Sequence, residues 1–210
     1  ETEFADYETV EYLQFQTAGW IGYVRNVLGF LTWPIVWPLA QLARLSDIVF
    51  RSFSELLSVV PYFPGVILRS EFYRFALRRL GRNVLIEFGV IFIYSDIEIG
   101  SNTLIGRYSI VHHCDIGDDV LIGERCTLLS GMRQHHYSRT DVPMTAQGGA
   151  KKRIRIGNDC WIGSHCVVGE PVNNGSIVGA GSVVTRPIPD FSIAVGNPAR
   201  VLKSRREAGN

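Results

Sequence analysis

Five histidines are the side chains of this 210-residue sequence whose type fits proton transfer near neutral pH. His112–His113 and His135–His136 form adjacent pairs, and His165 stands alone. With an unperturbed pKa of about 6.5, an imidazole can take up and return a proton, and its neutral form binds metal ions. A histidine in a polar segment can also be a solvated surface residue without a function. The sequence around each histidine is therefore needed to distinguish the two interpretations.

The elements that must position these histidines follow from a six-residue repeat. Isoleucine–glycine pairs recur after residue 98, the close pairs are six residues apart, and a small residue follows the isoleucine by four positions. We interpret each hexapeptide as one short strand and a turn, three of which close one coil of a parallel β-helix. Isoleucine then points inward and glycine allows the tight corner. The pairs are Ile99–Gly100, Ile105–Gly106, Ile116–Gly117, Ile122–Gly123, Ile156–Gly157 and Ile162–Gly163.

The four cysteines all occupy the small inward position of this repeat. They are too few for a disulfide scaffold, and the pattern predicts buried structural thiols in a reducing compartment rather than nucleophiles or metal ligands. The cysteines are Cys114, Cys126, Cys160 and Cys166.

Residues 1–80 have a different composition from the repeats. They hold 16 of the 23 aromatic residues, whereas 17 of the 21 glycines follow residue 80. The segment Asn26–Ala43 is an uncharged run of 18 residues. The periodicity predicts one helix over Leu39–Val60 and a second, arginine-rich helix over Val66–Leu80, with Gly81 as its stop.

Tryptophan, arginine and a wide apolar face are typical of helices that lie in a membrane interface. We therefore expect residues 1–80 to be an apolar helical segment at a membrane surface, with packing on the rest of the protein or on a partner, and a single span, as alternatives. The net charge of +1 gives no reason to expect nucleic acid. The acidic stretch Glu1–Glu11 lacks the basic start of a signal peptide, so a cytoplasmic, peripheral or monotopic location is expected.

From about Asn83 to Lys203 the sequence resembles the hexapeptide-repeat acyltransferases. The segments Ile156–His165, Ile177–Thr185 and Gly196–Arg200 are similar to the sugar O-acetyltransferases of the galactoside and maltose type. The resemblance implies a mainly β fold, a left-handed parallel β-helix over residues 81–205. It also implies a homotrimer, acetyl-CoA as acyl donor and no metal.

The repeat breaks between Arg133 and Ile154, and residues 134–153 are expected to form an inserted catalytic loop. Tyr137, Pro143 and Gln147–Gly148 resemble the loop of polysaccharide-modifying O-acetyltransferases, in which a histidine near the loop start is the catalytic base. The resemblance implies His135, two residues before Tyr137, as the base, with His136 as the alternative.

The same resemblance implies the residues that bind acetyl-CoA. Small corner residues would let the donor lie flat along the coils, a backbone amide would stabilise the oxyanion, and basic side chains would bind phosphates. The expected donor-binding residues are Trp161, Gly163, Ala180, Gly181, Ser182, Arg200 and Lys203.

These features predict an acetyl-CoA-dependent O-acetyltransferase acting on a sugar hydroxyl of a cell-envelope saccharide or lipid-linked glycan. Alternatives are an N-acetyltransferase for an amino sugar, a non-catalytic structural subunit of a membrane complex, and a zinc carbonic anhydrase of the γ type, whose histidine spacing is absent. Two departures from the pattern leave donor contacts and the acceptor open: the turn Gly169–Ser176 is shortened, and His112–His113 stand where acidic residues are common.

Overall fold

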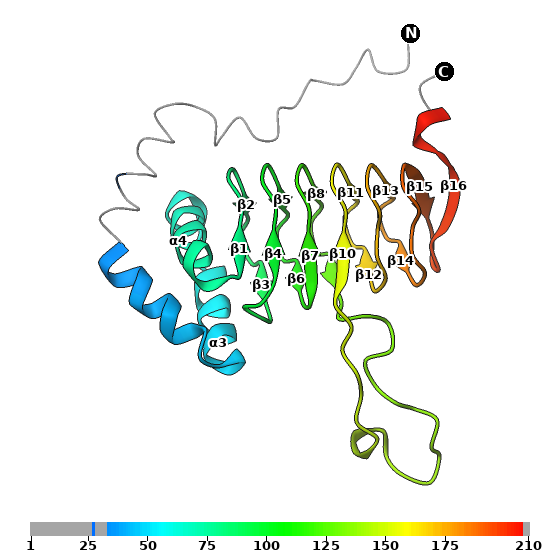
Figure 1. Ribbon diagram of the computed structural model, residues 1–210, viewed down its shortest axis with the longest axis horizontal. Helices are drawn as coiled ribbons and strands as arrows, with labels where there is room; N and C mark the ends of the chain where they lie inside the picture. Colours follow the sequence, from blue (N-terminus) through cyan, green and yellow to red (C-terminus); the bar gives the residue numbers. More distant parts are fainter. Residues whose placement is uncertain (1–26, 28–32, 208–210) are drawn as a thin grey trace.

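The computed structural model describes residue 27 and residues 33–207. The main body is a three-sided stack of short parallel strands, with helices at one end and the last strand at the other (Figure 1). This is the predicted mainly β architecture, a β-helix of hexapeptide repeats that follows a helical segment.

Three sheets form the three sides, and the chain passes from one side to the next at each corner. The first sheet contains β1 (Arg79–Leu80), β4 (Glu98–Ile99), β7 (Cys114–Ile116) and β10 (Ile154–Ile156). The second contains β2 (Leu85–Ile86), β5 (Leu104–Ile105), β8 (Leu121–Ile122), β11 (Trp161–Ile162), β13 (Ile177–Val178), β15 (Ser192–Val195) and β16 (Arg200–Ser204). The third contains β3 (Ile91–Phe92), β6 (Ile110–Val111), β9 (Thr127–Leu128), β12 (Val167–Val168) and β14 (Val183–Val184). All described pairings are parallel except that of β15 with β16.

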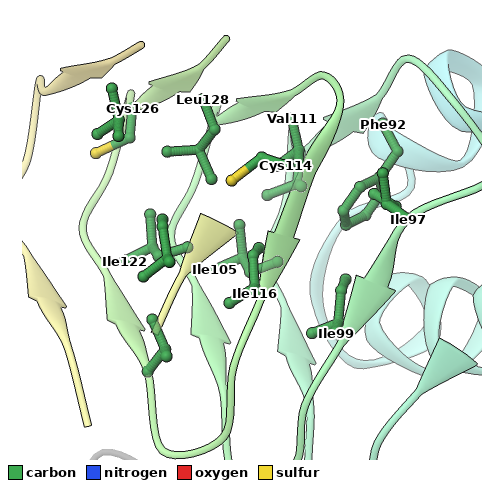
Figure 2. Packing of buried hydrophobic residues seen from close by; sticks show 14 of the residues in the cluster. Phe92, Ile97, Ile99, Ile105, Val111, Cys114, Ile116, Ile122, Cys126 and Leu128 are labelled. Carbon is green, nitrogen blue, oxygen red and sulfur yellow. The ribbon is translucent and has the colours of Figure 1, made fainter. Parts of the chain in front are cut away.

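The interior of the prism is built by the repeat as predicted. Ile105 and Ile122 are fully buried, and Figure 2 shows them stacked with their neighbours from successive coils. The four cysteines are free and buried, which confirms the inward slot. A Cβ on Gly100 would lie 2.4 Å from the carbonyl carbon of Gly117, so this corner has no room for a side chain.

The prediction of a single helix over Leu39–Val60 is wrong, because the helix is interrupted at residues 44–46. Residues 33–43 are helical, and a separate helix α3 runs over Asp47–Ser58. Between them Ser46 is extended, with φ −155° and ψ 135°, and occupies the N-cap position that serine favours. The break lets Ala40 and Phe50 enter the same core.

The second helix also differs from its prediction. Helix α4 spans Tyr62–Ala76, and Leu77 is extended at its end. The backbone N–H of Arg78 instead donates to the Ser95 carbonyl (2.9 Å), and β1 pairs with β4. Tertiary sheet pairing therefore overrides helix propensity, and Gly81 is a corner of the prism rather than a helix stop.

Helices α3 and α4 pack on the first coil. The hydroxyls of Ser54 and Tyr73 lie 2.7 Å apart inside this contact. Arg69, expected at the edge of a membrane-bound helix, is fully buried and donates to the carbonyls of Leu57 (3.0 Å), Val60 (2.9 Å) and Ile86 (3.0 Å). It ties the end of α3 to β2, which corrects that expectation.

The solvent-exposed side of the helical segment is mixed, with large apolar residues standing beside the exposed charges of Arg44, Asp47, Arg51 and Glu55. Leu45 is 80% exposed and Ile48 is 73% exposed, and Trp33 and Trp37 also contact solvent. In the described part of the chain, no helix combines the length and hydropathy needed to cross a bilayer. Residues 1–26 and 28–32 of the expected apolar segment lie outside the described residues.

Candidate active site

A groove of about 710 Å³ runs along the second sheet and the corner that follows it. It touches five consecutive coils, from the end of β2 to β13. With neighbouring strands about 4.8 Å apart, four strand spacings give it a length of about 19 Å. Its lining residues are Glu87, Leu104, Gly106, Leu121, Ile122, Gly123, Glu124, Trp161, Gly163, Ser164, Val178, Gly179 and Ala180.

Three of the predicted donor-binding residues lie together in this groove. Trp161 on β11 stands between Leu121 and Ile177 of the neighbouring strands and is 53% exposed. Gly163 and Ala180 lie on stacked corners: a Cβ on Gly163 would be 2.5 Å from the Ala180 amide nitrogen. These small corner residues leave the backbone open to a ligand that lies along the coils.

Gly181 and Ser182 follow Ala180 but do not line the groove. Gly181 has a left-handed φ of +71°, which glycine adopts without strain, and turns the chain into β14. The Ser182 side chain is fully buried, and its hydroxyl accepts a hydrogen bond from the Gly196 amide (3.0 Å). Ser182 therefore points into the prism rather than toward a bound donor.

Arg200 and Lys203 lie on β16, at the C-terminal end of the second sheet. They pair in register with Val195 and Ile193 of β15 and are exposed. Arg200 donates to the carbonyl of Ala199 (2.9 Å), and within the described residues neither side chain forms an ion pair with a carboxylate. Both cations are available to an anion at that end of the sheet.

The predicted loop leaves β9 and returns at β10, projecting from the prism (Figure 1). At its base the His136 amide donates to the Gly148 carbonyl (3.1 Å). Next to this contact, Gln147 Nε2 donates to the carbonyl of Arg139 (2.8 Å), while Gln147 Oε1 accepts from the Arg139 amide (3.1 Å). His135 and His136 are exposed.

The loop and the groove lie at different corners of the prism. The loop joins the third sheet to the first, whereas the groove follows the second sheet and the turn to the third. Among the described residues, none of the loop lines the groove. One chain therefore does not bring His135 to Trp161 and Ala180.

Two carboxylates of the groove were missed at the sequence level. Glu87 and Glu124 lie at the corners after β2 and β8; Glu87 stands at the position that Gly123 holds after β8, and Glu124 is one residue further along. Glu124 directly follows the Ile122–Gly123 pair, so its corner position could have been deduced from the repeat. Glu87 follows Ile86 without a glycine and carries no such signal.

A group of side chains around His113 joins Arg153, at the end of the loop, to Asp96 in the turn between β3 and β4. The ring of His113 stacks on that of Tyr94 (3.7 Å between centroids), and its Nε2 lies 3.3 Å from Asp96 Oδ1. Arg153 binds the Asp96 carboxylate as well. Burial lowers the pKa of His112, with the positive charges of His113, Lys151 and Arg51 adding to the effect, and burial also lowers the pKa of His113.

Cys114 and Cys160 have the properties of core residues. Burial raises the pKa of the Cys114 and Cys160 thiols, so both are protonated at neutral pH. Within the described residues no group of three His, Cys, Asp or Glu side chains is arranged to hold a metal ion.

Comparison with known proteins relates the repeat to bacterial transferases. Residues 96–130 match the model described as "Bacterial transferase hexapeptide (six repeats)", and residues 153–186 match "Hexapeptide repeat of succinyl-transferase". A galactoside O-acetyltransferase of Escherichia coli is 38% identical over 135 residues, 59% of this chain and 62% of that protein. The chain thus spans less than two thirds of that relative's length.

Solved structures give the same picture. A galactoside acetyltransferase solved in complex with coenzyme A superposes with a TM-score of 0.65 and 28% identity, covering 79% of this chain and 82% of that chain. A maltose O-acetyltransferase from Clostridium difficile gives a TM-score of 0.64 and 23% identity, covering 75% and 87%, and shares the fold.

Proposed function

We propose that the chain, whose repeats match those of hexapeptide-repeat transferases, is an acyltransferase of the sugar O-acetyltransferase branch and transfers an acetyl group from acetyl-CoA to a sugar hydroxyl. The observation that carries the proposal is the groove along the second sheet. It brings Trp161, Gly163 and Ala180 together, the residues that the acyltransferase motifs assign to the donor. The similar galactoside acetyltransferase was solved with coenzyme A.

The chemistry needs a base, because a sugar hydroxyl is a weak nucleophile at neutral pH. His135 takes the hydroxyl proton while the sugar oxygen forms a bond to the thioester carbonyl carbon. A backbone N–H near Gly163 or Ala180 stabilises the oxyanion of the tetrahedral intermediate. The carbon–sulfur bond then breaks, and the imidazolium returns the proton to the leaving thiolate of CoA.

A second copy of the chain completes the site in this proposal. Since the loop and the groove lie at different corners, His135 reaches a groove only on a neighbouring protomer. A three-sided prism with exposed Trp161 on one side suits a homotrimer in which each loop faces the next groove. Arg200 and Lys203 then bind phosphates of the donor.

We place the protein in the cytoplasm at a membrane surface. Four free cysteines fit a reducing compartment, and the exposed apolar side chains of Trp33, Trp37, Leu45 and Ile48 suit the interfacial region of a bilayer. The acceptor is then a cell-envelope saccharide or a lipid-linked glycan. Arg44 and Arg51 lie in the same helical segment and suit anionic headgroups.

The test is acetyl transfer by the purified full chain. With acetyl-CoA and a panel of neutral glycosides and amino sugars, we expect thiol release that depends on the acceptor and an O-acetylated product by mass spectrometry. Acetylation of amino groups alone would assign N-acetyl transfer instead. If no acceptor, including extracted cell-envelope saccharides, accelerates thiol release and acetyl-CoA does not bind, the proposed activity is wrong.

A further inference from the structure

A second cavity, of about 560 Å³, opens between the start of α4 and the first two coils. Its volume is within the range of about 300–1,000 Å³ that is usual for small-molecule sites. Its walls are mainly apolar, formed by Tyr62, Phe63, Val66, Leu85, Phe88 and Tyr108. The rings of Phe88 and Tyr108 meet edge to face at 5.6 Å.

The charged side chains of this cavity are engaged within the protein. Arg69 donates to the carbonyls of Leu57, Val60 and Ile86. Glu87 Oε2 accepts from the Arg107 amide (3.1 Å), and Glu87 Oε1 lies 3.6 Å from Arg107 Nε. With these groups paired, the remaining surface favours a hydrocarbon group over a hydroxyl-rich one.

This cavity continues the groove described above. Glu87 lines both, and Leu85 and Leu104, one from each cavity, are paired residues of β2 and β5. The cavity therefore lies beyond the end of the groove that is farthest from β13. Leu56 and Val59, shortly before the cavity-lining Pro61 in the chain, are 63% and 62% exposed.

We infer that this cavity binds the hydrocarbon chain of a lipid-linked acceptor whose sugar lies in the groove. The inference rests on the proposed function, because it assigns the substrate class of the same site. The acceptor is an amphiphile: its sugar hydroxyl meets the acetyl group, and its chain passes Glu87 to enter the space between Val66 and Leu85. The apolar walls stabilise the chain by removing it from water.

The test is a series of alkyl β-D-glucopyranosides from methyl to octyl. Binding to the purified full chain is measured by calorimetry below the micelle concentration and without acetyl-CoA. We expect the affinity to rise with chain length, by up to about fourfold for each fully buried methylene. Equal affinity for the methyl and octyl compounds would overturn the inference.

Two variants place the chain in this cavity. Val66→Trp and Leu85→Trp each fill it from a different wall, and either one is expected to remove most of the gain from methyl to octyl. Ile48→Trp is the matched control, because Ile48 is 73% exposed on the helical segment and does not line the cavity. Loss of the gain in Ile48→Trp alone, or its persistence in both cavity variants, would overturn the inference.

These measurements are independent of acetyl transfer. Chain-length-dependent binding that the cavity variants remove, together with no transfer to any sugar, would leave the cavity assigned and the proposed reaction wrong. Transfer to short glycosides without a chain-length effect would retain the reaction and overturn the lipid-linked acceptor.

Discussion

Glu87 and Arg107 are joined twice across the first two coils: the Arg107 amide donates to Glu87 Oε2 (3.1 Å), and Arg107 Nε lies 3.6 Å from Glu87 Oε1. The pair stands where the groove along the second sheet meets the aromatic cavity beside α4. A single carboxylate thus borders both the groove assigned to the donor and the acceptor sugar and the cavity assigned to the acceptor chain.

From the position of the groove, we predict that a larger side chain at its corner residues weakens acetyl-CoA binding. Ala180→Leu places a branched side chain at an exposed corner beside Trp161, and we expect the dissociation constant for acetyl-CoA to rise at least about tenfold. Ala146→Leu makes the same change at an exposed loop position outside the groove and serves as the control. Calorimetry with acetyl-CoA measures both; equal affinity in the two variants would remove the donor from this groove.

The corners of the prism predict a steric effect. A Cβ on Gly100 would lie 2.4 Å from the Gly117 carbonyl carbon, so Gly100→Ala is expected to lower the free energy of unfolding by about 1–3 kcal/mol. Gly148→Ala is the comparison: its Cβ meets no heavy atom within 4 Å, so only the strain of the left-handed φ of +70° in an exposed loop remains. Urea unfolding measures both losses. A larger loss for Gly148→Ala would contradict the stacked-corner account.

The contact between the helices and the first coil predicts a coupled loss of stability. Ser54 Oγ lies 2.7 Å from the Tyr73 hydroxyl and accepts a hydrogen bond from the buried Phe92 amide (2.8 Å). Ser54→Ala leaves that amide without its partner, at a cost of about 1–3 kcal/mol. A double-mutant cycle with Tyr73→Phe, measured by urea unfolding, should be non-additive. Unchanged stability in Ser54→Ala would argue against this packing.

The histidine cluster at the base of the loop predicts a pH dependence. Burial lowers the pKa of His112 below its ordinary value of about 6.5, so below that pH the unfolded chain binds a proton that the folded chain resists. The free energy of unfolding should therefore fall as the pH drops from 7 to 5. His112→Gln should flatten this dependence, and His113 should supply the remainder. Identical slopes for wild type and variant would contradict the assignment.

The repeat explains why so much of the prism was predictable. The sequence of each hexapeptide predicts its structure, because an isoleucine such as Ile105 must point into the prism and a glycine such as Gly100 must form a corner. Neighbouring coils repeat the same environment. The inward cysteines followed from that register alone. The groove residues Trp161, Gly163 and Ala180 followed from motifs within the same repeats.

The helical segment was less predictable because its structure depends on what it packs against. Contacts with the first coil determine three features of this segment: the break at Ser46, the end of α4 at Ala76 and the burial of Arg69. The periodicity of the helical residues does not indicate these contacts. Glu87 was missed for a similar reason. The separation of His135 from the groove depends on which corner the loop leaves.

The most direct test of the proposed reaction is the rate of acceptor-dependent CoA release by wild type, His135→Gln and His136→Gln at a saturating acetyl-CoA concentration. Removal of the base should lower kcat of His135→Gln by about 10²–10⁴-fold while the affinity for acetyl-CoA is retained. His136→Gln, whose backbone amide still bonds the Gly148 carbonyl, should keep most of the activity. An undiminished rate in His135→Gln would contradict the account.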